Sequence, residues 1–298
     1  MSTFLQLLTS GLALGSIYAL VALGFVVIYR SSQVFNFAQG ELVTLGAFTM
    51  ASLTEWGLPW GVALLAAMAL TGGVAAGIER AALRPLVGRP VFVTIILTIF
   101  IGFVLRALII ISWGTEARGM PTPWDPTATA DIAGATVLMT SVWTVVAGLV
   151  TLASFFLLIR YSRIGVAMRA TASDQEASLG VGIPVGRIFG TSWFIAGVYA
   201  TVAGVFLAMF PRTVDANLGY IALRAFPAVI VGGLDSALGT VIAGLALGVL
   251  EVMTQAYVNP ELGTFGHNFH SVFPYVVMIM FLVVRPYGLL GTKDVERV

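Results

Sequence analysis

The chain has 298 residues, of which 58% are hydrophobic and only 10% are charged, and its mean hydropathy is +0.98. Soluble domains carry about 25% charged residues, so this composition excludes a water-soluble protein and indicates one that lies in a lipid bilayer. The net charge of +1 gives no general attraction to nucleic acid, and the absence of cysteine excludes disulfides, thiolate metal sites and cysteine nucleophiles.

Apolar runs of about 20 residues are long enough to cross a bilayer as helices. They predict an all-α polytopic bundle of about eight spans, in a single domain of residues 1–298. The expected helices cover residues 5–29, 41–53, 61–78, 91–113, 137–159, 188–210, 237–256 and 272–284. No basic segment precedes the first run, which is also too long for a typical signal peptide, so we expect it to be a retained helix.

Two apolar stretches are too short to cross the bilayer alone, and they predict discontinuous or re-entrant helices. One is residues 41–53, unless the preceding "VFNFAQG" enters the membrane with it. The other is residues 225–233, which contain Pro227 and end in two glycines. Non-helical backbone at membrane depth is tolerated only where it is buried in protein or lines a cavity.

Positive charges predict the orientation, because cytoplasmic loops are enriched in Lys and Arg. Residues 79–89 and 160–187 are basic and are expected in the cytoplasm, whereas residues 114–136 are acidic and are expected outside. The N-terminus then lies outside. The mildly basic C-terminal tail favours the cytoplasm, but a count of spans places it outside unless residues 225–233 cross, so its side stays open.

The first break carries unusual polar residues. Acids within a membrane usually face the bundle interior or a water-filled path, so Asn36, Gln39 and Glu41 are candidates for lining or gating such a path. The alternative is that Glu41 stabilises the N-terminus of the broken helix, where the helix dipole favours a carboxylate. The two broken segments together give these candidate path residues: Asn36, Gln39, Gly40, Glu41, Gly232 and Gly233.

Other charged residues in apolar sequence have simpler interpretations. Arg106 lies deep in an apolar run and either meets an acid or anionic group or pairs structurally and snorkels. Asp235 and Glu251 flank the seventh span and are expected at the membrane boundary. His267 and His270 alone are weak evidence for a metal. No nucleotide-binding or hydrolase motif occurs, so no catalytic or metal residue is predicted.

Small residues recur at a spacing of four. Gly11 with Gly15, and Gly244 with Gly248, occur in two copies of "GLALG". Such pairs let helix backbones approach closely in a membrane, and close packing is the expected role. The copies also suggest an internal repeat, as in many transporters, with chance similarity as the alternative.

The longest hydrophilic segment expected in the cytoplasm is residues 160–187. Within it, "ATASDQEASLG" predicts a short amphipathic helix, capped by Ser173 or Asp174 and ended by Gly180 and Gly182. A surface helix held between two spans can transmit force from a partner to both of them. The alternative is a solvated loop.

The sequence "DQEASLGVGIP" resembles the EAA-type loop of bacterial ABC importer permeases, with Glu176, Ala177 and Gly180 at matching positions. More narrowly, the chain resembles the permease subunits of branched-chain amino-acid (leucine/isoleucine/valine) importers. The matching segments are "GLALGSIYALVALGFVVIYR", "VFNFAQGELVTLGAF", "RIGVAMRA", "VGGLDSALGTVIAGLALGVLE" and "RPYGLLG". The likeness covers nearly the whole chain; it departs at Gln39, where many relatives have histidine.

The resemblance implies a permease of the bacterial inner membrane that forms the path for branched-chain amino acids, or for urea, an amide or an aromatic acid. It implies a second homologous permease, a periplasmic solute-binding protein and two cytoplasmic ABC ATPases, which bind the ATP and Mg, so that this chain holds no cofactor. The ATPase-docking residues it indicates are Arg163, Arg169, Asp174, Glu176, Ala177 and Gly180.

The alternative from a different class is a secondary transporter or channel that works alone, coupled to an ion, with Glu41 as its ion site. An intramembrane enzyme is a third possibility, but the sequence contains no recognisable catalytic constellation.

Overall fold

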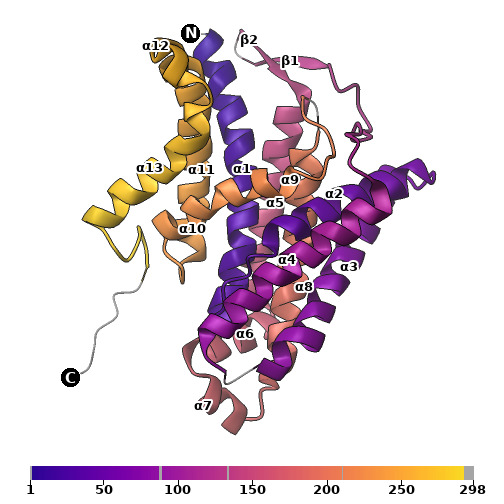
Figure 1. Ribbon diagram of the computed structural model, residues 1–298, viewed down its shortest axis with the longest axis vertical. Coiled ribbons are helices and arrows are strands. Elements are labelled where there is room, and N and C mark those ends of the chain that lie inside the picture. Colours follow the sequence, from indigo (N-terminus) through magenta and orange to yellow (C-terminus); the bar gives the residue numbers. More distant parts are fainter. Residues whose placement is uncertain (1, 87–88, 133, 210, 292–298) are drawn as a thin grey trace.

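The computed structural model describes residues 2–86, 89–132, 134–209 and 211–291, and over these residues it is a bundle of helices with one two-stranded hairpin (Figure 1). The elements, with η for 3-10 and π helices, are α1 Ser2–Ser32, α2 Gln39–Glu55, α3 Trp60–Ile78, η1 Glu79–Leu83, η2 Arg84–Leu86, α4 Val91–Trp113, β1 Thr129–Ile132, β2 Ala135–Leu138, α5 Met139–Tyr161, α6 Arg163–Ser173, α7 Gln175–Gly180, α8 Val185–Leu207, α9 Leu218–Ala222, η3 Leu223–Ala225, α10 Phe226–Gly232, α11 Ala237–Met253, η4 Thr254–Val258, α12 Asn259–Glu261, η5 Gly263–Gly266 and α13 Phe269–Val284.

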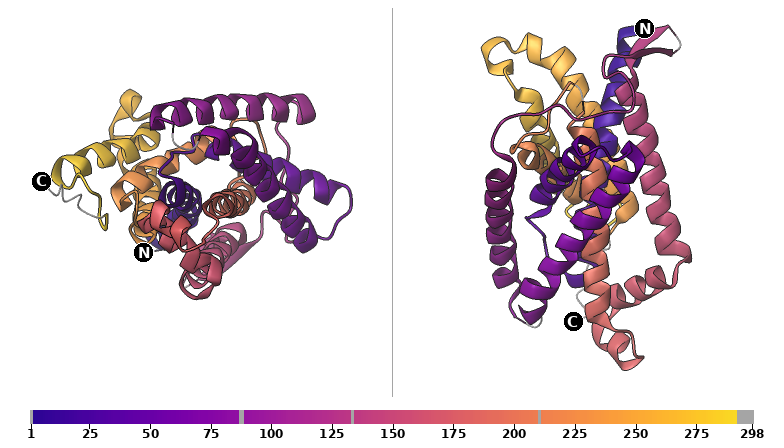
Figure 2. Two further views of the ribbon diagram at one scale, coloured as in Figure 1. Left: turned by 90° about the horizontal axis from the view of Figure 1, so that it is seen from below. Right: turned by 90° about the vertical axis from the view of Figure 1, so that its right-hand side faces the viewer.

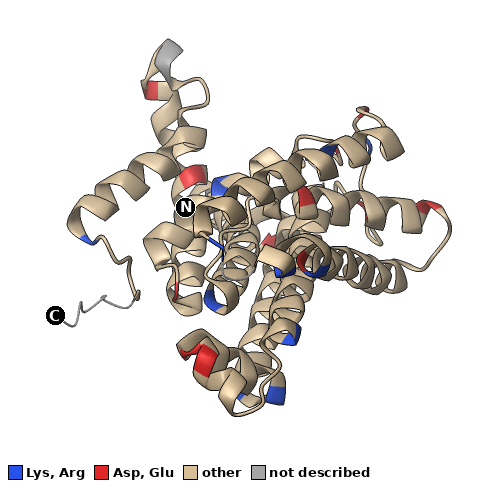
Figure 3. Cartoon of the chain, turned by 60° about the horizontal axis from the view of Figure 1, so that its bottom comes forward, with Lys and Arg blue, Asp and Glu red and all other residues tan. Residues whose placement is uncertain are grey.

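The predicted helical membrane bundle is confirmed. Six described helices are long and apolar enough to cross a membrane, and the segments Leu218–Gly232 and Phe269–Val284 are shorter apolar helices. The sixth expected helix was drawn to Phe210, which lies outside the described residues. Charged residues are sparse along the long helices (Figure 3), as the composition requires.

The β1–β2 hairpin was not predicted. Its strands pair antiparallel, with Ile132 opposite Ala135, and the turn between them contains Gly134 at φ +79°. The segment was expected only to be acidic and external, because strands of four residues give too short an alternation to recognise. The expected start of the fifth helix at Val137 was therefore wrong: Val137 belongs to β2, and α5 begins at Met139.

Helix α1 is the central element of the bundle. An 18-residue window of this helix is 94% buried, and α11, α8, α5 and α2 surround it (Figure 2). A helix that is apolar on every side is typical of such an enclosed position. The exposed sides of α3, α4 and α5 carry large apolar residues, such as Leu65, Phe103 and Val150, and suit contact with lipid.

The predicted close packing of the small residues is confirmed at the contact between α1 and α11. A Cβ atom added to Gly248 would lie 2.2 Å from the backbone nitrogen of Gly15. A Cβ atom on Gly15 would lie 2.7 Å from the carbonyl oxygen of Leu245, and one on Gly11 would lie 2.8 Å from the Cα atom of Val249. Backbone meets backbone here, so no side chain can move aside.

Replacing Gly248 with leucine is expected to prevent assembly of the bundle. Overpacking in a well-packed core costs about 1–3 kcal/mol or more, and here the obstacle is rigid backbone. Gly77→Leu on α3 is the matched control, because a Cβ atom there has no heavy atom within 4 Å. Size-exclusion chromatography of the extracted protein should show a folded peak for the control alone; an equal peak for Gly248→Leu would contradict this packing.

Candidate functional site

The chain is non-helical between α1 and α2, and two polar side chains satisfy this break from within the protein. Asn36 Oδ1 accepts a hydrogen bond from the backbone N–H of Ala38 at 3.1 Å, and Asn36 Nδ2 donates to Gln39 Oε1 at 3.3 Å. Gln39 Nε2 donates to the carbonyl of Ala196 on α8 at 3.4 Å. Both side chains are fully buried, so they hold the broken helix against α8.

Glu41 lies in the first turn of α2 and pairs with Arg106 of α4. Glu41 Oε1 is 3.4 Å from Arg106 Nη1, and the two side chains are 12% and 19% exposed. An isolated Arg at the centre of a membrane helix costs about 2.5–3.5 kcal/mol on insertion scales, and pairing offsets this cost for both charges. The helix dipole also favours Glu41 at this position, although its Oε2 atom has no hydrogen-bond partner among the described residues.

Two residues of the segment around α9 complete the surroundings of this ion pair. Arg106 Nη2 donates to Asn217 Oδ1 at 3.0 Å, and the guanidinium lies 4.3 Å from the ring centroid of Tyr220. Sequence reasoning missed Asn217 and Tyr220, since a hydrophilic residue next to a short apolar segment gives no signal of its own. The only available signal was Arg106 itself, an intramembrane base that required a partner.

Gly40 lets α9 reach Glu41. A Cβ atom on Gly40 would lie 2.6 Å from the carbonyl oxygen of Gly219, and one on Gly219 would lie 3.0 Å from Glu41 Oε1. The broken helix α2 therefore meets the segment Leu218–Gly232 at two glycines, directly beside the carboxylate.

Gly232 and Gly233 lie at the other end of the segment Leu218–Gly232 and contact different elements. A Cβ atom on Gly232 would lie 2.3 Å from Thr240 of α11. Gly233 has φ +103°, and a Cβ atom there would lie 2.7 Å from the backbone nitrogen of Gly291. The backbone N–H of Leu289 donates to Val231 at 2.7 Å. These two glycines thus form the turn into α11 and pack against residues 285–291, whereas Gly40 and Glu41 contact α9.

A second buried charge cluster corrects the expected position of Glu251. This residue was expected at the membrane boundary, but α11 continues beyond it into η4, and Glu251 is only 2% exposed. Tyr18 Oη of α1 donates to Glu251 Oε2 at 2.7 Å, and Arg224 Nη1 of η3 lies 3.6 Å from Glu251 Oε1. Through this cluster, the middle of the segment Leu218–Gly232 contacts α1 and α11.

The histidines and Asp235 do not converge on a site. His270 Nδ1 lies 2.8 Å from Asn259 Nδ2, His267 is exposed, and Asp235 is half-buried in the turn before α11. In the part of the chain that the structure describes, no group of three or more His, Asp or Glu side chains is placed to hold a metal ion.

Helices α6 and α7 lie at the end of the bundle opposite the N-terminus (Figure 1). The predicted short helix is present as α7, and the residues "ATAS" before it belong to α6, a helix that was not predicted. Asp174, one of the two expected caps, is extended, with φ −157°, and separates the two helices. Its Oδ1 atom accepts the backbone N–H of Ala177 at 2.9 Å and so caps α7. Ser162 caps α6 in the same way, accepting the N–H of Gly165 at 2.9 Å, and Gly182 with φ +85° follows the end of α7.

The six residues predicted for docking are all exposed: Arg163, Arg169, Asp174, Glu176, Ala177 and Gly180. They lie next to the apolar Leu179 and Val181, which are 60% and 78% exposed. Two of the six also make structural contacts, since Asp174 caps α7 and Arg169 donates to the carbonyl of Ile159 at the end of α5. The outward surface is therefore held in place by two of its own residues.

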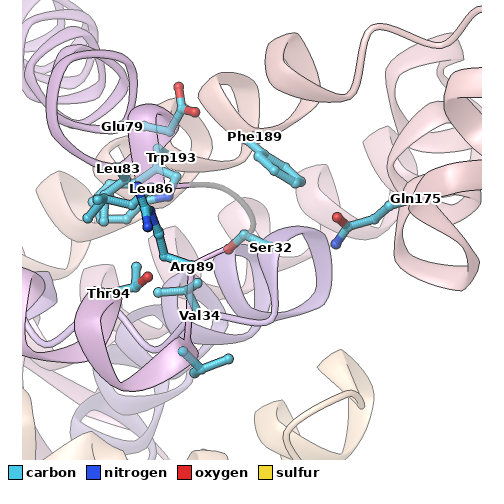
Figure 4. Close-up of a pocket in the computed structure, with 11 residues that line it drawn as sticks. Ser32, Val34, Glu79, Leu83, Leu86, Arg89, Thr94, Gln175, Phe189 and Trp193 are labelled. Carbon is cyan, nitrogen blue, oxygen red and sulfur yellow. The ribbon is translucent and has the colours of Figure 1, made fainter.

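A pocket lies between α7 and the adjacent ends of the long helices, with an empty volume of about 610 Å³ that includes the space at its mouth. Ser32, Arg89 and Gln175 reach it from three different segments (Figure 4). Gln175 Nε2 also donates to the carbonyl of Ser31 at 3.4 Å, which connects α7 to the end of α1. Glu79, which also lines the pocket, forms an ion pair with Arg84 at 2.6 Å.

Comparison with known proteins identifies this architecture. Residues 7–282 match the sequence model of the family described as branched-chain amino acid transport system / permease component. The chain belongs to this family. It is 31% identical to the "High-affinity branched-chain amino acid transport system permease protein LivH" of Escherichia coli K12, with 99% of this chain and 98% of that one aligned.

A second relative agrees with this membership, and a solved structure shows the same fold. The permease is 30% identical to the "High-affinity branched-chain amino acid transport system permease protein BraD" of Pseudomonas aeruginosa, over 99% of this chain and 98% of that one. It shares its fold with a chain of the solved structure "PsaBC from Streptococcus pneumoniae in complex with Fab", with a TM-score of 0.51 and 12% identity, over 95% of this chain and 92% of that one.

The permease is therefore a multi-pass membrane transport subunit of an ABC importer and not itself an enzyme. A permease of this kind works with ATPase subunits and a solute-binding protein. The secondary-transporter alternative is not favoured, because the family and both relatives are permease components of transport systems.

Asp174→Ala is expected to weaken α7 and to lower the amount of ATPase that co-purifies with the permease. Loss of an N-cap costs about 1 kcal/mol of helix stability. Asp174→Asn is the matched control, because asparagine caps equally well without the charge. If Asn behaves like Ala, then the charge of Asp174 matters and its role as a cap is contradicted.

Proposed function

We propose that the permease forms, with a second homologous permease, the translocation path of an importer for branched-chain amino acids or a related small solute such as urea, an amide or an aromatic acid. A periplasmic binding protein delivers the solute, and the complex lies in the bacterial inner membrane. The relatives' printed names support the amino-acid class, and the observation that carries the mechanism is the rigidly capped pair α6–α7 at one end of the bundle.

The coupling role of residues 163–180 is supported by their contacts in both directions. Outward, Glu176, Ala177 and Gly180 are exposed for a cytoplasmic ATPase subunit, one of two in the complex. Inward, Arg169 is bonded to the end of α5 and Gln175 to the end of α1. Closure of the ATPase dimer on ATP then displaces these helix ends as rigid bodies.

The topology that agrees best with this role counts the segment Leu218–Gly232 as a crossing. The segment is a continuous apolar helical stretch, although shorter than the long spans. With the N-terminus outside, this extra crossing places residues 285–291 on the same side as α6 and α7. Arg285, which follows α13, then lies on this side, in agreement with the positive-inside rule.

The path is proposed to run beside Glu41 and the segment Leu218–Gly232. Glu41 is the candidate that retains some exposure, while Asn36 and Gln39 are fully buried and hydrogen-bonded inside the chain. Gly40, Gly232 and Gly233 make close backbone contacts. In this proposal Glu41 borders the path, and the other five residues shape the two broken helices that present it.

Uptake in proteoliposomes tests the proposed function. We expect leucine uptake with both permeases, both ATPases, the binding protein and ATP, and none when the ATPases are left out. Uptake by this chain alone, driven by an ion gradient and abolished by Glu41→Gln, would instead establish the secondary transporter. Titrating the cognate binding protein with leucine, urea and aromatic acids identifies the solute class.

A further inference from the structure

One face of the segment Leu218–Gly232, with Asn217 before it, is polar although the segment lies among apolar helices. Asn217, Tyr220 and Arg224 follow one another at i, i+3 and i+7, which places them on the same side of a helix. Asn217 is exposed, Tyr220 is 55% exposed and the side chain of Arg224 is 31% exposed. The opposite side, with Leu218, Gly219, Ala222 and Ala225, is buried.

Arg106 extends this face. Its guanidinium rests on the ring of Tyr220 and bonds both Asn217 and Glu41. Arginine carries five N–H donors in a planar fork, which suits the two oxygens of a carboxylate. These two partners occupy only part of the fork, and the Arg106 side chain is still 19% exposed.

A lipid environment does not suit this face. Polar and ionisable side chains in membrane segments face the bundle interior or a water-filled cavity rather than hydrocarbon. The exteriors of α4 and α5, in contrast, show residues such as Phe103 and Val150 to their surroundings. The polar face formed by Asn217, Tyr220 and Arg224 therefore borders water or another protein.

Glu41 supplies an independent observation. Its Oε2 atom is buried and has no hydrogen-bond partner among the described residues, whereas Oε1 faces Arg106. A buried carboxylate oxygen without a donor is costly, and an ammonium group would satisfy it. A carboxylate acceptor and an arginine fork thus lie side by side, with the two charges that an α-amino acid complements.

We propose that Arg106, with Asn217, Tyr220 and Glu41, forms a transient binding site for the zwitterionic solute. Arg106 receives the carboxylate, Glu41 Oε2 accepts from the ammonium, and Tyr220 contacts the apolar side chain. Arg224 lies seven residues after Asn217, about 10 Å along the helix axis. We propose it as the next residue that the carboxylate contacts. This site rests on the proposed function, because it requires that an amino acid passes this face.

The chain contains no cysteine, so single cysteines report directly on this face. Tyr220→Cys, with Asn217→Cys as a second position, is placed in the complete importer in proteoliposomes and treated with a membrane-impermeant maleimide–polyethylene glycol, and the mass shift of this chain is followed. Val150→Cys on the apolar exterior of α5 is the control. A thiol in hydrocarbon does not ionise to the reactive thiolate, so it should react at least about tenfold more slowly.

We expect modification at position 220 or 217, slowed severalfold by saturating leucine but not by leucinamide, which lacks the carboxylate. Arg106→Gln should abolish this protection, and Arg106→Lys should retain part of it. Three results would overturn the site: reactivity as low as that of Val150→Cys, modification that leucine does not slow, or equal protection by leucinamide. Leucine uptake by the unsubstituted importer is measured in parallel, so failure of the site is distinguished from failure of the proposed function.

Discussion

Replacing Gly180 with tryptophan is expected to abolish co-purification of the ATPase subunits and ATP-driven uptake while the permease itself stays folded. Gly180 ends α7 on the exposed side, and a Cβ atom there has no heavy atom within 4 Å. A bulky side chain at this position therefore disturbs a docked partner and not the permease. We expect association with the ATPase to weaken at least about a hundredfold, which corresponds to about 2.7 kcal/mol, measured by titration of the ATPase onto immobilised permease.

Two further variants show whether the effect belongs to this surface. Glu176→Trp, also exposed and on the same helix, should weaken the ATPase association similarly. Gly119→Trp is the matched control, because Gly119 also has open space around it but lies in the long connection between α4 and α5. Unchanged co-purification and uptake with Gly180→Trp would remove α7 from the docking surface.

Neutralising Glu41 alone is expected to destabilise the permease, and neutralising Glu41 and Arg106 together is expected to restore the fold without restoring uptake. Removing one partner of a buried ion pair costs about 3–5 kcal/mol, because the other charge is left unpaired. Glu41→Gln should therefore lower the thermal unfolding midpoint of the purified complex. The double variant Glu41→Gln with Arg106→Gln carries no net charge here and should recover most of that midpoint.

The two readouts separate the roles left open for Glu41. If Glu41 borders the path, leucine uptake stays below about a tenth of the wild-type rate in the double variant, although the complex assembles; a tenfold loss corresponds to about 1.4 kcal/mol in the barrier. Full recovery of uptake together with stability would show that the pair is only structural. Failure of the double variant to assemble would show that this hydrogen-bonded geometry, rather than charge balance, holds α2 and α9 together.

Local sequence was sufficient for the helices and for one of their contacts. Each long span is a run of apolar residues, and its length alone identifies it. The glycines of the two "GLALG" segments predicted close packing because only small residues allow it, and the structure places Gly15 and Gly248 against one another. The position of the break before α2 was also visible, because polar residues interrupt an apolar run there.

Features that depend on which segments meet in space were not predictable. Glu41 and Arg106 are 65 residues apart, and Tyr18 and Glu251 are 233 apart, so nothing local indicates either pair. Asn217 and Tyr220 gain their meaning only from Arg106. Helix α6 was not predicted, because Arg163 and Arg169 make it part of one hydrophilic segment, whereas Asp174 was correctly expected to cap the helix that follows.

Site-directed cross-linking from α7 determines whether this helix docks on a cytoplasmic ATPase subunit. Ala177→Cys provides a single reactive thiol on the exposed side of α7, because the chain has no cysteine of its own. With a short bifunctional reagent in the assembled importer, we expect a cross-link to an ATPase subunit whose yield changes when ATP is added. A cross-link to the periplasmic binding protein, or none to the ATPase in an importer that transports normally, would contradict this docking.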